Sequence, residues 1–260
     1  MVARMTGPLH FERHAHLYTR ARPPYPTALW DRLRAVGLLR SGARALDVGA
    51  GTGQATGPLL DAGMHVTALE PGRRLASELR ARHPAAVVDE HTAEEAELPA
   101  GAFDLVVSAT SVHWLDLDIV LPRLHAALTD DGHFAVWRNV FGDETVSTPF
   151  RDRVHEIVER RHGPPRTGPV TLDEASWPMT LSAGGYFKVT HVETFRWSVR
   201  LDADQVRDLF TTFSDWSADE AAEAGRAAQE LGGAVTEYYS TPLVVLERAP
   251  EGSARRPAGR

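Results

Sequence analysis

Hydrophobic and polar positions follow two alternating patterns along the chain. Continuous apolar runs predict buried β-strands at residues 44–49, 65–70, 85–89, 103–109 and 133–139, the last of them after a turn at Asp131-Gly132. Between the runs, apolar residues recur every three or four positions and predict helices at residues 27–36, 54–62, 72–83 and 117–128. We therefore expect an α/β protein with a parallel sheet covered on both faces, because each parallel crossover needs a helix.

The regular alternation stops after Asn139. Roughly fifty residues separate it from the next predicted strand, 187–199, which is too long for a bare loop. Thr148-Pro149 predicts the start of a helix that Gly163 ends. The apolar stripe of this helix consists of Phe150, Val154, Ile157 and Val158.

Two further helices and one strand complete the C-terminal part. Asp202 with Gln205, and Ser217 with Glu220, have the spacing of helix N-terminal capping pairs. The apolar run 243–247 predicts the final strand. The first of these helices carries a stripe of Leu209, Phe210 and Phe213. We interpret this stripe and that of Val154, Ile157 and Val158 as packing of a lid against the core.

These elements predict one domain over residues 1–248 with a seven-stranded sheet. We expect the core to consist of residues from about 27–140 and 185–248. The lid is expected from about 1–26 and 141–184, with the helices of 202–232 adjoining it. Residues 249–260 are expected to form a disordered tail.

Composition excludes several kinds of chemistry. The 260 residues carry a net charge of −7, so we expect no nucleic-acid partner. Cysteine is absent, which excludes disulfides, thiol nucleophiles and cysteine-bound clusters, and no metal site is expected. Lys188 is the single lysine, and no glycine-lysine pair of a phosphate-binding loop exists. Neither a signal core nor an apolar run of about 18 residues is present, so we expect no membrane partner and a cytoplasmic location.

The most informative segment is Ala45-Leu-Asp-Val-Gly-Ala-Gly-Thr-Gly-Gln54, which joins the first strand to the next helix. Alternating glycines allow a backbone to approach a ligand closely. A dinucleotide loop would have a third glycine where Gln54 stands. Glu70, at the end of the second strand, could accept hydrogen bonds from the ribose of a dinucleotide or of another ribose-bearing cofactor, so it does not decide between them. Asp47 favours a cationic ligand, because its carboxylate would repel a pyrophosphate.

The loop resembles motif I of class I S-adenosylmethionine-dependent methyltransferases. The similarity continues through Leu69-Glu70-Pro71, Thr92-Ala93-Glu94, Leu98-Pro99, Phe103-Asp-Leu-Val-Val-Ser108, Val112-His-Trp-Leu-Asp116 and the arm from Tyr18 to Arg22-Pro-Pro-Tyr-Pro26. This ordered series is similar to the type-11 group of small-molecule methyltransferases, including the relatives of trans-aconitate methyltransferase. The resemblance implies a Rossmann-like fold, S-adenosyl-L-methionine as cofactor and S-adenosyl-L-homocysteine as product.

The same resemblance assigns roles to residues. The glycines would wrap the methionine part of the cofactor with Asp47 orienting the loop, Glu70 would hold the ribose, and residues 92–94 would border the adenine. Ser108 and Ala109 would lie near the donor methyl, and Tyr18 and Arg22 could close over the cofactor. The cofactor-binding candidates are Tyr18, Arg22, Asp47, Gly49, Gly51, Gly53, Gln54, Glu70, Pro71, Thr92, Ala93, Glu94, Ser108 and Ala109.

The residues that would bind the methyl acceptor are less well defined than those for the cofactor. His113 is the candidate general base, because we expect its imidazole to titrate near neutrality, and shaping the pocket is the alternative role for it. Tyr25, Trp114 and Arg138 are substrate candidates, with Trp114 favoured as packing and Arg138 or Arg22 as partner of an acceptor carboxylate. The sequence reads Ser-Ala-Thr-Ser at 108–111 in place of an Asn-Pro-Pro-Tyr motif, which disfavours methylation of DNA bases or protein glutamine.

We therefore predict methyl transfer to a small molecule, to oxygen ahead of carbon or nitrogen. A protein of this fold that binds the cofactor without methyl transfer, and a nicotinamide oxidoreductase, remain alternatives. The sequence leaves open whether the protein is a monomer or a homodimer.

Overall fold

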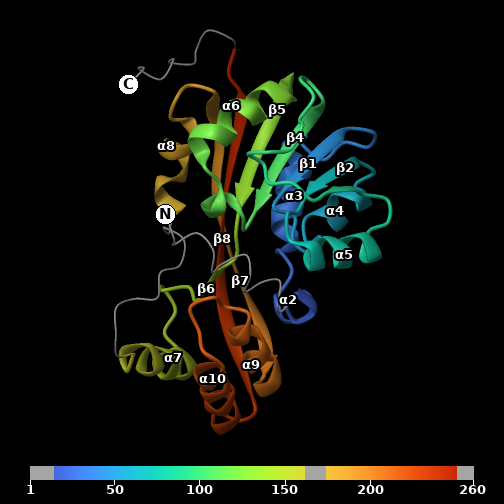
Figure 1. The fold of residues 1–260 in the computed structure, drawn as a ribbon. Coiled ribbons are helices and arrows are strands. Elements are labelled where there is room, and N and C mark those ends of the chain that lie inside the picture. Colours follow the sequence, from blue (N-terminus) through green and yellow to red (C-terminus); the bar gives the residue numbers. More distant parts are fainter. Residues whose placement is uncertain (1–14, 162–173, 251–260) are drawn as a thin grey trace. The chain divides into compact units, whose positions relative to one another are not determined.

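The computed structural model describes residues 15–161 and 174–250, and these fall into two compact units. Unit 2 contains residues 25–138, 174–195 and 241–250, and unit 1 contains residues 15–24, 139–161 and 196–240. Figure 1 labels most of the helices and strands of both units. Two long strands, β7 (Phe187–Asp202) and β8 (Ala234–Arg248), contribute residues to each unit. The stretches 1–14, 162–173 and 251–260, including the predicted stop at Gly163 and most of the predicted tail, lie outside the described residues.

Unit 2 is built on a mostly parallel sheet. Its strands are β1 (Arg44–Val48), β2 (His65–Leu69), β3 (Val87–Asp89), β4 (Phe103–Ala109), β5 (Leu128–Trp137) and the parts of β7 and β8 in this unit. The order β3-β2-β1-β4-β5-β8 places β1 at the centre, with β7 paired to β8. The first five strands are parallel and β8 is antiparallel to β5. The predicted α/β class with a mostly parallel sheet is confirmed.

Alternate residues of the central strands face two different apolar cores. Leu46 and Val48 of β1 contribute to one core, and Ala45 contributes to the other, as the two-residue period of a strand requires. The helical segments of this unit are α3 (Thr27–Ala35), α4 (Thr56–Asp61), α5 (Arg73–Arg82), η1 (Val112–Trp114), α6 (Leu117–Ala127), η2 (Glu174–Ser176) and α8 (Trp177–Ser182). The sequence pattern did not predict η2 and α8, although Trp177 and Leu181 of α8 are fully buried.

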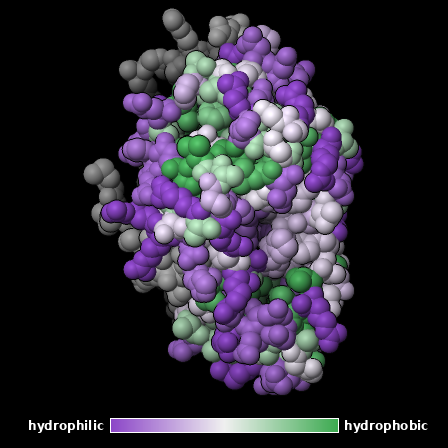
Figure 2. Space-filling view, turned by 90° about the vertical axis from the view of Figure 1, so that its right-hand side faces the viewer, coloured by the Kyte–Doolittle hydropathy of each residue, from purple (hydrophilic) through white to green (hydrophobic). Residues whose placement is uncertain are grey.

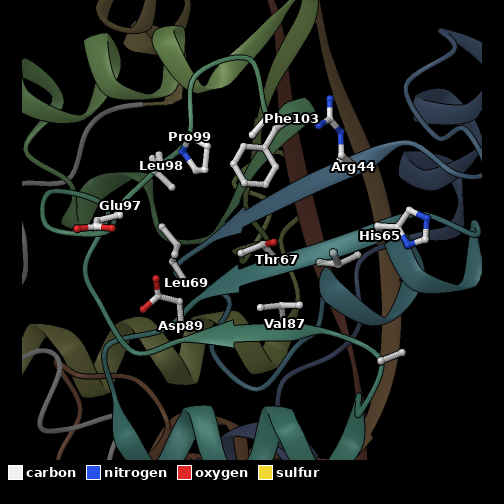
Figure 3. Close-up of a pocket in the computed structure, with 13 residues that line it drawn as sticks. Arg44, His65, Thr67, Leu69, Val87, Asp89, Glu97, Leu98, Pro99 and Phe103 are labelled. Carbon is white, nitrogen blue, oxygen red and sulfur yellow. The ribbon is translucent and has the colours of Figure 1, made fainter.

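The expectation that a helix accompanies every crossover is wrong between β3 and β4. Residues 90–102, all described, contain no helix. One face of the sheet here is a groove of about 400 Å³, lined among others by Thr67, Leu69, Val87 and Phe103 (Figure 3). Val87 in this groove is 66% exposed. Figure 2 shows apolar surface gathered into a patch on the side of the molecule that it faces. None of the predicted site residues lines this groove.

The predicted turn at Asp131-Gly132 is also absent as a separate element. β5 runs from Leu128 through these residues, and its pairing with β4 shifts from Phe103 opposite Leu128 to Leu105 opposite His133. Extra residues on one strand form a bulge and leave the strand continuous on both sides of it. The turn-forming residues are therefore accommodated within the strand.

Unit 1 has its own helices and its own apolar core. It contains α2 (Ala15–Ala21), β6 (Val140–Phe141), α7 (Pro149–Glu159), α9 (Ala203–Thr211), α10 (Ala218–Glu230) and the remaining parts of β7 and β8. β6 pairs with β8 and makes eight strands in the described residues, where seven were expected. Both predicted capping boxes are present, at Asp202 with Gln205 and at Ser217 with Glu220.

The two apolar stripes predicted for the lid pack against each other within unit 1. Phe150, Val154 and Ile157 of α7 join Leu209 and Phe210 of α9 in one cluster of buried residues, with Phe213 packed against it. Val158, which was assigned to the same stripe, is exposed. These stripes therefore form the core of unit 1. Among the described residues, none of the helices has the length and apolar character needed to cross a membrane.

Candidate active site

The carboxyl ends of β1, β2 and β4 lie side by side in unit 2. Val48 is the register partner of Leu69 on β2, and Asp47 is the register partner of Val107 on β4. The glycine loop leaves β1 at this edge, and open parallel sheets bind ligands at the carboxyl ends of their strands. The topology therefore brings the glycine loop, Glu70 and the residues after β4 to one edge of one sheet.

Hydrogen bonds from the loop to the end of β2 hold the loop in place. The backbone N–H groups of Gly49 and Ala50 both donate to the carbonyl of Leu69, at 2.9 and 3.0 Å. The Glu70 carboxylate accepts from the N–H of Gly51 at 2.8 Å and from the N–H of Gly72 at 2.7 Å. Glu70 is 6% exposed. Its carboxylate thus fixes the shape of the loop, a role that the sequence did not indicate.

The three glycines of the loop all have positive φ, at 67°, 60° and 91°, but they face different surroundings. A Cβ on Gly49 would lie 2.6 Å from the Cβ of Ser111, and a Cβ on Gly53 would lie 2.4 Å from Cδ2 of His83. A Cβ on Gly51 would meet no atom of the described structure within 4 Å. Gly49 and Gly53 are therefore needed for packing inside the protein, and Gly51 is the loop glycine with open space in front of it.

Asp47 is fully buried beneath this loop. Its Oδ2 accepts a hydrogen bond of 2.7 Å from the hydroxyl of Thr56, whereas its Oδ1 has no hydrogen-bond partner among the described residues. Burial raises the pKa of Asp47 to about 6, and the hydrogen bonds from Thr56 oppose that rise. At neutral pH the carboxylate is still mostly ionised, and Oδ1 can accept a hydrogen bond from a bound group.

Residues at the end of β4 are tied to the loop and to the neighbouring strands. Ser111 donates to the carbonyl of Val48 and shares a 2.7 Å hydrogen bond with Ser108. Thr110 has a φ of 63°, which is uncommon for a residue other than glycine. Its hydroxyl lies 2.8 Å from that of Tyr25. This strained turn sets the direction of the chain from β4 into η1.

Several predicted residues here are more deeply buried than their assigned roles suggest. Ser108 is fully buried, and Tyr25 packs edge-to-face against Trp30 and Trp137. Ala109 is half-buried at the strand end, and Trp114 lies beside His113 with 5.2 Å between ring centroids. Tyr25 is accordingly a packing residue whose hydroxyl supports the turn after β4.

The segment predicted to border the adenine follows the carboxyl end of β3. Ala93 is buried, and its carbonyl accepts from Nε of Arg123 at 3.0 Å. The Glu94 carboxylate accepts from the backbone N–H of Asp116 at 2.9 Å, and the hydroxyl of Thr92 donates to Glu95 at 3.3 Å. This segment is thereby linked to α6, at its N-cap residue Asp116 and at Arg123 within it. Gln54 in the loop is half-buried, and Pro71 after Glu70 is exposed.

His113 in η1 and Arg138, directly after β5, lie near enough for the charge of Arg138 to act on the imidazole. Burial and, to a smaller extent, the positive charge of Arg138 lower the pKa of His113 to about 4. Nδ1 of His113 is buried and has no hydrogen-bond partner among the described residues. Arg138 forms an ion pair with Glu174 of η2. His113 is therefore neutral at neutral pH, and the sequence-based expectation that its imidazole titrates near neutrality is wrong because the ring is desolvated.

Tyr18 and Arg22 lie in unit 1, not in the unit that contains the loop. The Arg22 guanidinium donates to the hydroxyl of Thr212 at 2.9 Å and lies over the rings of Tyr18 and Phe213. The other cofactor candidates all lie in unit 2, whereas Tyr18 and Arg22 lie in unit 1. Their proposed closure over a cofactor stays a prediction.

The sequence reasoning missed four residues that shape this edge of the sheet: Thr52, His83, Thr110 and Ser111. Thr52 is buried in the loop, and its hydroxyl has no hydrogen-bond partner among the described residues. His83 fills the space beside both Gly53 and Gly57 and hydrogen-bonds the backbone of Gly53. Gly57 inside a predicted helix was a usable signal, because such a glycine indicates a close approach by another group.

Comparisons with known proteins agree with this geometry. Residues 46–136 match a family described as a methyltransferase domain. An uncharacterized methyltransferase of Mycobacterium tuberculosis is 34% identical over 167 residues, which cover 64% of this chain and 65% of the relative. Malonyl-acyl-carrier-protein O-methyltransferase of Geobacter sulfurreducens is 35% identical over 124 residues, which cover 44% of this chain and 46% of that protein. The chain thus aligns with less than two thirds of the length of these relatives.

The fold itself has been seen in solved structures. A proposed type II methyltransferase from Anaeromyxobacter dehalogenans superimposes with a TM-score of 0.68 at 23% identity, covering 88% of this chain and 97% of that one. The chain therefore shares the Rossmann-like fold of this structure, and over residues 46–136, which carry the glycine loop and the end of β4, it matches the methyltransferase-domain family.

Proposed function

We propose that this protein is an S-adenosylmethionine-dependent methyltransferase that acts on an oxygen atom of a small molecule. The observation that carries the proposal is the combination at the loop of open space before Gly51 and an unpartnered buried oxygen of Asp47. Glu70 stands at the neighbouring strand end. Such a site fits a ligand that lies against the backbone and brings both ammonium and hydroxyl donors.

The residues present fit this cofactor well. Oδ1 of Asp47 would accept from its amino group, and the remaining lone pairs of Glu70 would accept from the ribose hydroxyls. The backbone at Gly51 allows the close approach. When bound, the cofactor supplies a methyl group already activated by a sulfonium. The protein then has to align an acceptor and exclude water.

The acceptor side favours a carboxylate over a hydroxyl. A histidine with a pKa of about 4 is poorly matched to the removal of a hydroxyl proton. A carboxylate has already lost its proton, and the guanidinium of Arg138 would attract it. Such an acceptor would exchange with Glu174, which pairs with Arg138 in the structure. The name of the Geobacter sulfurreducens relative, an O-methyltransferase, supports transfer to oxygen.

Calorimetric titration with S-adenosylhomocysteine tests the donor site. We expect binding to the wild-type protein and a loss of about 1–3 kcal/mol of binding free energy in Glu70→Ala, because a buried charged acceptor is removed. Glu90→Ala is the matched control, since Glu90 is a partly exposed acid paired with Arg80 near the end of β3. Equal affinities in the two variants would contradict the role of Glu70.

Incubation with radiolabelled S-adenosylmethionine and a metabolite extract tests the transfer itself. A labelled product that requires the protein is expected. Donor binding without any labelled product would favour the alternative, a protein of this fold that binds the cofactor and transfers nothing. Binding of a nicotinamide dinucleotide with no response to S-adenosylhomocysteine would favour an oxidoreductase.

A further inference from the structure

The inner face of β8 in unit 1 carries a second pair of buried polar side chains. The alternation along this strand turns Val235, Glu237 and Tyr239 inward. Glu237 is 1% exposed and Tyr239 is 2% exposed. Charged side chains are almost never buried so completely without a hydrogen-bonding partner. This pair is therefore unusual for a strand in an apolar core.

Neither side chain has its hydrogen-bonding capacity filled. Both carboxylate oxygens of Glu237 and the hydroxyl of Tyr239 have no hydrogen-bond partner within the described parts of the chain. Native proteins satisfy nearly all buried polar atoms, so three such atoms on two neighbouring inward positions need an explanation. In unit 2 the same feature, on Oδ1 of Asp47, marks the edge where the donor site is proposed.

The surrounding residues hold this pair in a fixed arrangement. Nε of Arg151 lies 3.4 Å from Oε1 of Glu237, and the Arg151 guanidinium also donates to the carbonyl of Phe141. Gly142 makes room for it, because a Cβ there would lie 0.8 Å from the guanidinium. The ring of Tyr239 stacks on Trp197 with 4.7 Å between centroids and 17° between planes. The hydroxyl and carboxylate are thus preorganised.

The charges around the pair show which ligand it suits. The charged groups that act on it are Arg151 from α7, Arg22, which follows α2, and the two side chains themselves. Burial raises the pKa of Glu237 to about 7, against the opposing charge of Arg151. An ionised carboxylate only accepts hydrogen bonds, so groups that donate to it would complete the site and favour its charged form.

We propose that Glu237 and Tyr239 form a ligand site in unit 1 that takes a small polar molecule carrying hydroxyl or ammonium donors. The site goes beyond the proposed function, because binding at it involves neither the methyl donor nor a residue of the glycine loop. Its test is therefore made without S-adenosylmethionine, and the failure of one proposal leaves the other standing.

Thermal unfolding with three small probes at the same millimolar concentration tests the class of ligand. Ethanolamine offers an ammonium and a hydroxyl, ethylene glycol offers hydroxyls alone, and tetramethylammonium offers charge without a donor. We expect ethanolamine to raise the Tm of the wild-type protein and tetramethylammonium to leave it unchanged. A rise with ethylene glycol as well would assign the hydroxyl as the recognised group, and a rise with ethanolamine alone would assign the ammonium. No response to either donor probe would overturn the proposal.

Substitutions separate a ligand site from a structural role. Tyr239→Phe and Glu237→Gln should abolish the response to the probes. Tyr239→Phe should also leave the Tm of the ligand-free protein equal to or above that of the wild type, because it removes a hydroxyl without a partner. Tyr238→Phe, the next residue on the same strand, is the control and should keep the response. A drop in Tm with Tyr239→Phe beyond that of Tyr238→Phe would show an internally satisfied hydroxyl and overturn the proposal.

Discussion

Within the described residues, each unit of this protein buries a carboxylate whose pKa is raised, Asp47 in unit 2 and Glu237 in unit 1. Asp47 accepts hydrogen bonds from the hydroxyl and the backbone of Thr56, only nine residues away, and its pKa is about 6. Glu237 forms an ion pair with Arg151 at 3.4 Å, and its pKa is about 7. A local hydrogen bond thus offsets part of the desolvation at Asp47, whereas Glu237 depends on a charge from a distant segment.

The comparison extends to the neighbourhoods of the two residues. Around Asp47, the loop, the end of β2 and the start of α4 supply a dense set of hydrogen bonds between residues close in sequence. Around Glu237, the neighbours come from the separate elements β6, α7 and β7. Polar groups held by local contacts produce a recognisable motif, and polar groups held by long-range contacts do not.

The largest expected effect is in the loop itself. Gly53→Ala should lower the free energy of unfolding by about 3 kcal/mol, because it adds a clash with His83 to the strain of a positive φ. Chemical denaturation of Gly53→Ala, His83→Ala and the double variant measures the effect. We expect the double variant to be more stable than the sum of the single effects implies, since the clash is then absent. Simple additivity would mean that His83 does not determine the need for glycine.

The next largest expected effect is on the pH dependence of stability, which compares the desolvation of the two buried carboxylates. Both folded pKa values lie above the ordinary ones, so the native state binds more protons and its stability rises as pH falls. Between pH 8 and 5, Glu237 should contribute about 2.5 kcal/mol to this rise and Asp47 about 1.4 kcal/mol, at about 1.4 kcal/mol per pKa unit.

Urea denaturation of the wild type, Glu237→Gln and Asp47→Asn at pH 5 to 8 checks these contributions. The other titrating groups are common to all three proteins and cancel in the differences. Each substitution should reduce the rise in stability with falling pH by the contribution of the carboxylate that it removes. The reduction should be larger for Glu237→Gln than for Asp47→Asn. An equal slope in Glu237→Gln and the wild type would mean that this carboxyl is not desolvated in the folded protein.

The smallest effect on stability distinguishes a ligand-facing glycine from a structural one. Gly51 and Gly101 have φ values of 60° and 61°, and a Cβ on either would meet no atom within 4 Å. Alanine at each should therefore cost about 1 kcal/mol of stability through backbone strain. Only Gly51→Ala should also weaken S-adenosylhomocysteine binding, by about tenfold or more. Unchanged affinity in Gly51→Ala would place the ligand elsewhere.

Much of unit 2 could be predicted from the sequence. The bounds of β4 at Phe103–Ala109 and the start of β1 at Arg44 follow from continuous apolar runs. In unit 1, the capping boxes at Asp202 and Ser217 could also be predicted from the sequence, because their hydrogen bonds join residues three positions apart. The short helix α8 and the long β8 were not, since Trp177 and residues 234–242 become regular only through packing against distant partners.

The candidate site also has features that the sequence determined and features that depend on the tertiary structure. The sequence by itself determined that a glycine loop with Asp47 follows β1 and that Glu70 follows β2, because these features depend on neighbours in the chain. Only the tertiary structure decided that Gly49 and Gly53 serve internal packing, that His113 is too buried to titrate near neutrality, and that Glu237 and Tyr239 share one buried face. Those properties depend on which distant atoms exclude water from a group, and desolvation is a property of the folded chain.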